Sequence, residues 1–362
     1  MQIKNEFNHD RLRLARVAAA KSYLDIGELL NVTRQYAHKL EVNAIPSQKQ
    51  LKSLANYLNV EESFFLVPRK KIIELEQCHF RSLRSSTLNL KKTIIAQVEI
   101  FEEIQSHLEN EVIFPNIRIP DLGKEDNFTS DFIEQIAEKL RRDIGLGLGP
   151  ISNMIKLAEK IGCLVLDIAE VDDRIDAFSI YRDRPLIIRN IKKSNACRLR
   201  FDIGHELGHL FLHQGIETGC HITEGQANQF ASALLIPRVS FANEFPIMRG
   251  NYLNWSALAK FKIRWGVSFK AIIYRANKLG LLNDKQAKTG FIYLARHGYT
   301  KEEEFDDQIP MEYPTVIQKA LNILDFKTWN NIIRSVGVTN GFILMHYLIN
   351  PPQNHLKLIQ SN

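Results

Sequence analysis

LRFDIGHELGHLFLH, residues 199–213, combines an apolar run long enough for a helix with the pattern His-Glu-x-x-His. In an α-helix, the four-residue spacing of His205 and His209 places both imidazole rings on one face, one turn apart. Two ring nitrogens in that arrangement converge on a single ion, and Glu206 lies on the side where a bound water would sit. The stretch therefore predicts a helix with the geometry of a zinc hydrolase.

The residues around these polar side chains predict that the helix is buried. Leucine, isoleucine and phenylalanine occupy most of the remaining positions of the stretch. Burying two histidines and a glutamate costs free energy unless they have a partner, and a bound metal ion provides one. The alternative is a buried helix in which the two histidines are incidental.

A second helical segment follows at EGQANQFASALLIP, residues 224–237. Its apolar residues recur at helical spacing, and Pro237 ends the run. A site with two histidines needs a third protein ligand to hold zinc and still leave a position for water, and a carboxylate from a second helix is a common solution. Glu224 is the candidate ligand, and Asn228, one turn later, is placed to hydrogen-bond a histidine ligand. The alternative for Glu224 is a first-turn glutamate that only favours the helix N-terminus.

The expected cofactor is one Zn²⁺ per chain, held by His205, His209 and Glu224, with Glu206 as the catalytic base. Manganese (Mn²⁺) or iron is also compatible with two histidines and one carboxylate. Cys220, four residues before Glu224, is an alternative ligand, although a structural cysteine is the commoner case. Proximity in sequence alone suggests three candidates for the group that stabilises the oxyanion, namely Tyr181, Arg198 and His221.

These segments resemble the ImmA/IrrE family of metallo-endopeptidases. HELGHLFLH and EGQANQFASALLIP are similar to the two metal-binding elements of that family, and WGVSFKAIIYRANKLGLL, residues 265–282, is similar to the helical segment that follows them. The resemblance implies a mainly helical, zincin-like peptidase domain with one small sheet. It also implies a substrate, since members of the family cleave helix-turn-helix repressors.

The N-terminal part, residues 8–66, has the pattern of a five-helix bundle that contains a helix-turn-helix. Asn31 falls at the tight turn between the second and third helices, which requires a residue tolerant of positive φ. Thr33 is placed to cap the third helix. The residues expected at the DNA-binding surface are Thr33, Arg34, Gln35, Tyr36, His38 and Lys39.

This region resembles the Cro/C1-type (XRE) helix-turn-helix family, with VTRQYAHKLE, residues 32–41, corresponding to its recognition helix. It departs from the family where Tyr23 replaces the usual glutamine and Asn31 replaces the usual turn glycine. The resemblance implies that residues 1–68 fold alone and bind duplex DNA through phosphate contacts and through base contacts of Arg34 and Gln35. A bundle used for dimerisation or protein docking is the alternative.

Composition predicts a soluble, cytoplasmic protein. The chain has 362 residues, of which 45% are hydrophobic, enough to bury a core in two or three domains. No apolar run reaches about eighteen residues and the N-terminus is too polar for a signal peptide, so no membrane association is expected. The four cysteines are widely spaced and are expected to be reduced thiols. The net charge of +6 favours a polyanionic partner.

The remaining segments are less specific. Residues 69–128 are predicted to form a helical connector, with one long helix over 88–109 and a basic cluster. This cluster either extends a nucleic-acid footprint or forms a solvated helix face, and it comprises Arg69, Lys70, Lys71, Arg81, Arg84, Lys91 and Lys92. The only sheet is predicted at CLVLDI, 163–168, and FSIYRDRPLIIRN, 178–190.

The sequence as a whole predicts an α+β protein that is predominantly α. A helix-turn-helix domain (1–68) and the connector (69–128) precede a metallopeptidase domain (129–285) and a helical C-terminal region of unknown role (286–362). The expected function is zinc-dependent cleavage of a helix-turn-helix repressor, which relieves repression in a stress response or in control of a mobile element. The alternative is a DNA-binding regulator or antitoxin-like protein whose metallopeptidase-like half senses or scaffolds without turnover. A dimer is compatible with both.

Overall fold

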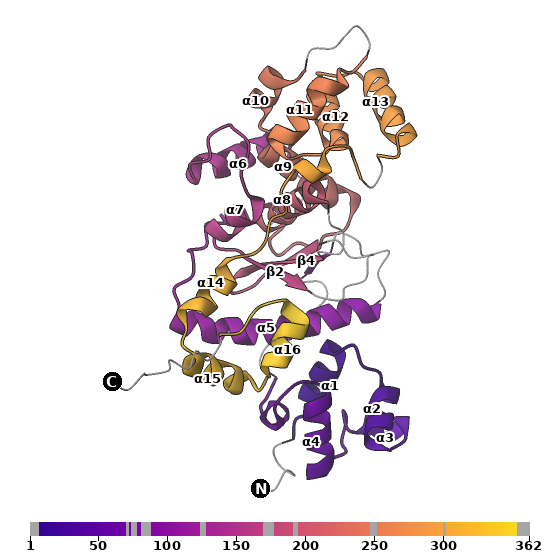
Figure 1. Cartoon of the computed structure of the whole chain (residues 1–362), viewed down its shortest axis with the longest axis vertical. Helices are drawn as coiled ribbons and strands as arrows, with labels where there is room; N and C mark the ends of the chain where they lie inside the picture. The colour runs from indigo at the N-terminus through magenta and orange to yellow at the C-terminus, as the bar shows by residue number, and fades with distance from the viewer. Residues whose placement is uncertain are drawn as a thin grey trace, which may run out of the picture.

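The computed structural model describes residues 7–69, 72–73, 78–80, 88–123, 128–168, 177–190, 195–246, 252–299 and 302–352. Within these residues the molecule is elongated and mostly helical, with one small sheet near its middle (Figure 1). The N-terminal helices form one end, and the C-terminal helices return to that end after the chain has formed the other (Figure 1). The predicted α+β, predominantly α, class is confirmed. Among the described helices, none combines the length and the apolar character needed to cross a membrane.

The helix-turn-helix region contains five helices, as predicted, the last of them a 3₁₀-helix. They are α1 (His9–Ala18), α2 (Tyr23–Leu30), α3 (Arg34–Lys39), α4 (Gln48–Tyr57) and η2 (Glu62–Leu66). Asn31 has a φ of 54° and ends α2 in the left-handed conformation, and the Thr33 hydroxyl accepts a hydrogen bond from Tyr36 N at 3.2 Å. Both turn residues therefore act as predicted and fix the geometry between α2 and α3.

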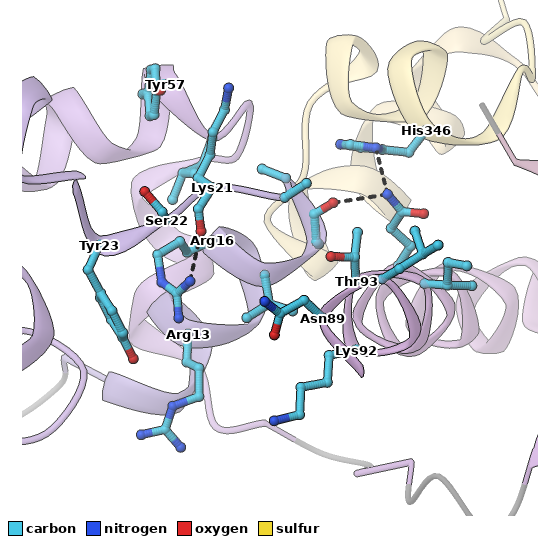
Figure 2. Close-up of a pocket in the computed structure, with 18 of the residues that line it drawn as sticks. Arg13, Arg16, Lys21, Ser22, Tyr23, Tyr57, Asn89, Lys92, Thr93 and His346 are labelled. Atoms are coloured by element: carbon cyan, nitrogen blue, oxygen red, sulfur yellow. Dashed lines mark hydrogen bonds between the residues drawn. The ribbon is translucent and has the colours of Figure 1, made fainter. Parts of the chain in front are cut away.

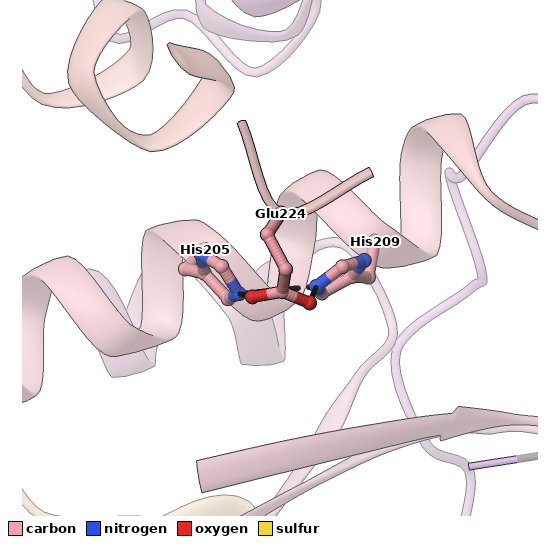
Figure 3. Close-up of side chains that lie close together, drawn as sticks. All are labelled: His205, His209 and Glu224. Atoms are coloured by element: carbon pink, nitrogen blue, oxygen red, sulfur yellow. Dashed lines mark hydrogen bonds and ion pairs between the residues drawn. The ribbon is translucent and has the colours of Figure 1, made fainter. Parts of the chain in front are cut away.

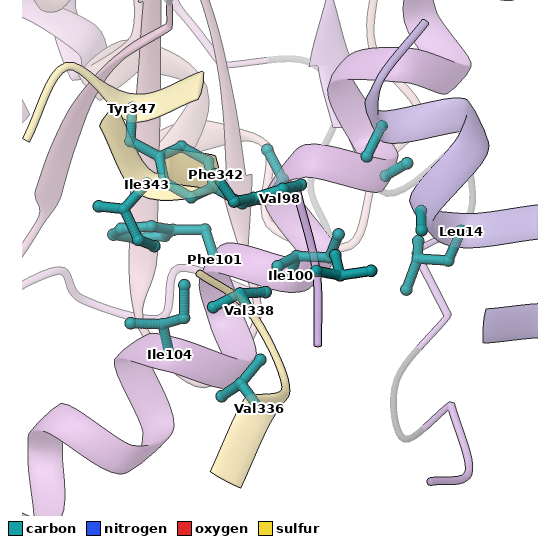
Figure 4. Close-up of a cluster of buried hydrophobic side chains, with 14 of the residues drawn as sticks. Leu14, Val98, Ile100, Phe101, Ile104, Val336, Val338, Phe342, Ile343 and Tyr347 are labelled. Carbon is teal, nitrogen blue, oxygen red and sulfur yellow. The ribbon is translucent and has the colours of Figure 1, made fainter. Parts of the chain in front are cut away.

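Helix α5 (Leu88–Glu111) runs between the helix-turn-helix region and the sheet (Figure 1). It confirms the predicted long helix and extends two residues further. Phe101 of α5 belongs to the same hydrophobic core as Leu14 of α1 and the C-terminal residues Phe342 and Tyr347 (Figure 4). A fragment that ends at residue 68 would expose its side of this shared core to water, so DNA binding has to be measured on the intact chain.

Arg11 of α1 forms bonds with η2, with α5 and with α15. Its side chain is fully buried and donates hydrogen bonds from Nε to Phe64 O and from Nη2 to Val336 O, each at 3.1 Å. Its Nη1 pairs with Glu103 Oε1 of α5 at 2.6 Å. One arginine thus connects the helix-turn-helix region with α5 and with the C-terminal region.

We expect Arg11→Met to lower the free energy of unfolding by about 3 kcal/mol, because it leaves the Glu103 carboxylate and two carbonyl groups without their donor. Urea unfolding followed by circular dichroism measures the loss. Arg13→Met, which removes a side chain that is 45% exposed on the same helix, is the matched control and should cost about 1 kcal/mol or less. Equal losses in the two variants would contradict the joining role of Arg11.

The sheet has four strands, β1 (Cys78–Phe80), β2 (Leu164–Ile168), β3 (Ala177–Tyr181) and β4 (Pro185–Asn190), in the order β1-β3-β4-β2. β3 pairs antiparallel with β1 and β4, and β2 pairs parallel with β4. Strands β2 to β4 lie in the two predicted segments. Strand β1 lies within the segment predicted as a helical connector and was not expected, because three residues are too few to show a strand periodicity.

The two faces of the sheet belong to different cores. Phe178 and Ile180 of β3 pack into the core that contains α5, whereas Ile187 of β4 packs into the core of the metal-binding region. Because side chains alternate along a strand, Ser179 and Tyr181 share the face opposite Phe178. That face covers the helix formed by the His-Glu-x-x-His stretch.

Among the described residues between 130 and 296 there are eight helices, with β2 to β4 between the second and the third of them. They are α6 (Ser130–Asp143), α7 (Met154–Lys160), α8 (Ala196–Leu212), α9 (His221–Leu235), α10 (Arg238–Glu244), α11 (Trp255–Trp265), α12 (Phe269–Lys278) and α13 (Asp284–Arg296). Glycine permits the close packing of α8 on α9, since a Cβ added at Gly208 would lie 2.9 Å from Ala227 Cα. The two predicted metal-binding segments are therefore adjacent helices.

The C-terminal region is helical, as predicted, and connects both ends of the molecule. Its elements are the 3₁₀-helix η4 (Asp306–Gln308) and the helices α14 (Val316–Ile323), α15 (Phe326–Val336) and α16 (Asn340–Tyr347). Glu312 accepts a hydrogen bond from Met154 N at 2.8 Å and pairs with Arg200 of α8. Gly337 O accepts a hydrogen bond from Glu61 N at 2.8 Å, so the same region also holds the helix-turn-helix region.

Candidate metal centre

Helices α8 and α9 bring three of the predicted site residues together. His205 and His209 lie one turn apart on α8, and both are fully buried. Glu224 lies in the first turn of α9 and directs its carboxylate between the two imidazole rings (Figure 3). Among the described residues, these three form the group whose ligand atoms lie close enough to hold one metal ion.

The separations of the ligand atoms suit a zinc ion. The Nε2 atoms of His205 and His209 are 3.0 Å apart. Glu224 Oε2 lies 3.4 Å from His205 Nε2, and Glu224 Oε1 lies 3.4 Å from His209 Nε2. Ligands at about 2.0–2.1 Å from zinc in a tetrahedral arrangement are about 3.3–3.4 Å apart. Glu224 Oε1 is buried and has no hydrogen-bond partner among the described residues. The three side chains therefore fit the metal that the sequence predicts.

The electrostatics of Glu224 also suit a ligand. Burial alone would raise the pKa of this carboxyl group, but its interactions with the side chains of His205 and His209 outweigh burial and lower the pKa to about 2. The side chain is therefore ionised at neutral pH, as a carboxylate ligand must be.

Hydrogen bonds on the far side of each histidine ring determine which nitrogen faces the ion. His205 Nδ1 lies 3.0 Å from Asn228 Oδ1, which only accepts, so Nδ1 has the proton and Nε2 has the free lone pair. His213 Nε2 lies 2.8 Å from Gln226 Oε1 and must donate to it, which leaves His213 Nδ1 to accept from His209 Nδ1 at 3.0 Å. Burial lowers the pKa of His213, in agreement with a neutral ring. His209 Nε2 is then also free to bind metal.

Sequence reasoning assigned no role to His213 or Gln226. His213 repeats the four-residue spacing from His205 to His209, a signal that points to the same helix face. Gln226 lies on the next helix, 13 residues after His213, and becomes its partner only through the packing of α9 on α8. Partners of this kind orient metal-binding histidines and raise metal affinity.

We expect Gln226→Leu to weaken zinc binding by about 10- to 100-fold, because it removes the acceptor that fixes the protonation of His213 and hence of His209. Competition with a chromophoric chelator measures the dissociation constant. Gln229→Leu, the same change on the same helix at a residue that bonds Ser130 instead, is the matched control. Zinc affinity that is equal in the two variants would contradict this role of Gln226.

Glu206, the predicted catalytic base, lies on α8 between the two histidines and is fully buried. Its Oε2 accepts a hydrogen bond from the Ser179 hydroxyl of β3 at 2.6 Å. A serine in a strand gives no signal in the sequence, so this partner was not predicted. The bond orients the Glu206 carboxylate relative to the ligands.

The alternative ligand and the three candidates for stabilising the oxyanion lie in different environments. Cys220 caps the N-terminus of α9 by accepting from Thr223 N, and it is not part of the metal-binding group. Arg198 is half-exposed and lies 3.8 Å from Asp202, and His221 is exposed. Tyr181 shares a face of β3 with Ser179, and burial raises the pKa of its hydroxyl, which therefore stays protonated. Tyr181 also packs against the core that contains Ile203 and Leu207 of α8.

Most of the residues predicted to contact DNA are accessible in the structure. Arg34, Gln35, His38 and Lys39 are exposed on α3, with Thr33 exposed at its N-cap. Tyr36 is only half-exposed, because its ring packs against the core. Tyr23 directs its hydroxyl to Glu41 Oε2 at 2.9 Å, and the Arg16 guanidinium lies over its ring. In the predicted basic cluster, Lys70, Lys71, Arg81 and Arg84 lie outside the described residues.

Two family models match the chain. Residues 158–277 match the IrrE N-terminal-like domain of the M78 peptidases, a range that includes β2 to β4, α8 and α9. Residues 12–65 match a helix-turn-helix model. No curated protein matches the chain. The chain therefore joins a helix-turn-helix domain to an IrrE-like domain of a metallopeptidase family, and the predicted fusion is confirmed.

Proposed function

We propose that this fusion is a zinc-dependent endopeptidase that binds duplex DNA and cleaves a helix-turn-helix repressor. The observation that supports the peptidase most directly is the buried group of His205, His209 and Glu224, with Glu206 beside it on α8. Metal-assisted hydrolysis needs a set of ligands that leaves one position open and a base next to it. The three candidate ligands and Glu206 lie within the range that matches the IrrE-like domain, which supports this proposal.

The roles of the residues follow from their chemistry. Zinc bound by His205, His209 and Glu224 would supply the Lewis acidity that activates the attacking water and polarises the scissile carbonyl. Glu206 takes a proton from the water as its oxygen attacks the carbonyl carbon, and gives it to the leaving amine when the C–N bond breaks. Ser179 orients Glu206 for both transfers. The Tyr181 hydroxyl donates to the oxyanion that develops on the carbonyl oxygen.

The sheet limits how an extended substrate is held. β3 is the strand that contacts Glu206, and it is already paired by β1 on one side and β4 on the other. A substrate strand that binds by main-chain hydrogen bonds would therefore add at an edge of the sheet, β1 or β2, and not beside β3. A flexible segment of the substrate suits this arrangement better than a folded domain.

The second candidate function is DNA-binding regulation without turnover. It is favoured by the shared core of α1, α5 and the C-terminal helices, which couples the helix-turn-helix region directly to the rest of the molecule. A metal site in such a protein would act as a sensor or a structural element.

One experiment separates the two functions. The intact, zinc-loaded chain is incubated with a panel of purified helix-turn-helix repressors, and the products are identified by mass spectrometry. Cleavage at a defined peptide bond that stops with a chelator and returns with zinc supports the endopeptidase. Stoichiometric zinc binding with every repressor left intact supports the regulator.

A further inference from the structure

A basic cavity of about 1110 Å³ lies outside the metal centre, between the α1–α2 turn, α4, the first turns of α5 and α16 (Figure 2). Its lining includes five basic side chains, Arg13, Arg16, Lys21, Arg34 and Lys92. None of the described residues that line it is an aspartate or a glutamate. The cavity therefore has a positive lining formed by segments that are far apart in the sequence.

The five basic side chains differ in whether they form ion pairs. Arg16 pairs with Glu41 at 2.5 Å, and Arg13 lies 3.2 Å from Asp10. In the part of the chain that the structure describes, Lys21, Arg34 and Lys92 form no ion pair. An anionic partner would therefore gain favourable interactions there without first displacing an existing carboxylate.

The position of the cavity identifies the partner. Arg34 is the first residue of α3, and Ser22 caps the N-terminus of α2. In a helix-turn-helix, the start of the recognition helix approaches the bases, while neighbouring segments approach the phosphates. Lys92 and Asn89 line the same cavity from α5, whose first turns lie on the side of the molecule where α2 and α3 are found (Figure 1). The cavity thus extends the expected DNA surface onto α5.

The arrangement of the charges suits a chain of phosphates better than one small anion. Lys21 and Lys92 extend toward opposite sides of the cavity and do not converge on a single point (Figure 2). A DNA strand presents phosphates at regular intervals and places one at each of several separate cations. The Tyr23 hydroxyl lies nearby at the start of α2, but its proton is donated to Glu41, so it is not counted among the groups that would bind a phosphate.

We propose that α5 is a second DNA-contacting element and that Lys92 binds a backbone phosphate of the duplex beyond the segment contacted by α3. This inference rests on the DNA binding included in the proposed function. It concerns affinity and not base recognition, because an ammonium group on a phosphate distinguishes no sequence. The site is formed only in the intact chain, since α5 lies outside the helix-turn-helix region.

The test measures the salt dependence of binding. A fluorescent duplex of mixed sequence, about 30 base pairs long, is titrated with the intact chain at several salt concentrations, and anisotropy gives the affinity. Lys92→Gln should reduce the slope of log affinity against log salt by about 1, because one phosphate contact is lost. Lys288→Gln makes the same charge change at an exposed lysine of α13, at the far end of the molecule, and should leave the slope unchanged.

Each outcome has a distinct meaning. Salt-dependent binding that Arg34→Gln weakens and Lys92→Gln leaves unchanged would overturn the inference and leave DNA binding by the helix-turn-helix intact. No binding of the duplex by the wild-type chain would overturn the DNA-binding part of the proposed function, and the inference with it. Calorimetric titration with ATP tests a free phosphorylated ligand, and binding that Lys92→Gln abolishes would reassign the cavity to such a ligand.

Discussion

Glu206→Gln is expected to lower the rate of peptide cleavage by about 10²- to 10⁴-fold while zinc remains bound. The amide has nearly the shape of the carboxylate, and its oxygen can still accept the hydrogen bond from Ser179. It cannot take a proton from water at neutral pH, so the step that generates the nucleophile is lost. Because Glu206 is not one of the three ligand side chains, the substitution leaves His205, His209 and Glu224 in place.

The measurement combines two assays on the same preparation, cleavage of an identified repressor and zinc content by mass spectrometry. Glu217→Gln, which makes the same change at an exposed residue between α8 and α9, is the matched control and should cleave like the wild type. Full activity of Glu206→Gln with zinc bound would remove Glu206 from the mechanism. Loss of zinc together with activity would instead assign Glu206 to the metal site.

The centre of the site was predictable because its determinants are local. The four-residue spacing of His205 and His209 fixes their common face as soon as the segment is helical, whatever surrounds it. The helical pattern after Glu224 placed a carboxylate in the first turn of a second helix. What the pattern alone could not show is that α8 and α9 are neighbours. The glycine at 208 allows that contact, and its effect depends on the position of Ala227.

The residues that support the site could not be predicted, because each depends on a contact between separate helices or strands. Ser179 meets Glu206 only because β3 lies against α8, and a single serine among apolar residues has no distinctive spacing. Gln226 meets His213 only across the interface of α8 and α9. Such partners are specified by tertiary packing, and periodicity within one segment does not encode it.

The same limit applies to the domain arrangement. Helix periodicity located the helix-turn-helix region and α5 correctly, yet it gave no sign that they share a core. That core depends on α15 and α16, which follow the metal-binding region by many residues and return to contact α5. Arg11 looks like a surface arginine in an amphipathic helix, and only its contacts with Glu103 and Val336 explain its burial. A boundary drawn from sequence pattern at residue 68 therefore divides a continuous core.

Glu224→Ala is expected to weaken zinc binding by roughly a thousandfold, so that the purified protein retains little metal. A bound zinc ion stabilises a protein site by about 10–16 kcal/mol shared among its ligands, and losing one ligand removes a few kcal/mol of this. The Nε2 atoms of His205 and His209 remain 3.0 Å apart in the wild-type geometry, but two ligands hold zinc poorly. Helix α9 should persist, since Cys220 and not Glu224 caps its N-terminus.

Two readouts test this expectation without any need for a substrate. Zinc content should fall from one ion per chain to nearly none in Glu224→Ala, while Glu217→Ala, at the exposed position used above, should keep its zinc. A chelator should lower the melting temperature of the wild type, because bound metal stabilises the folded state, and should leave that of Glu224→Ala unchanged. Stoichiometric zinc in Glu224→Ala would exclude Glu224 as the third ligand. Zinc analysis of Glu224→Ala combined with Cys220→Ser or with His221→Ala would then show which neighbour replaces it.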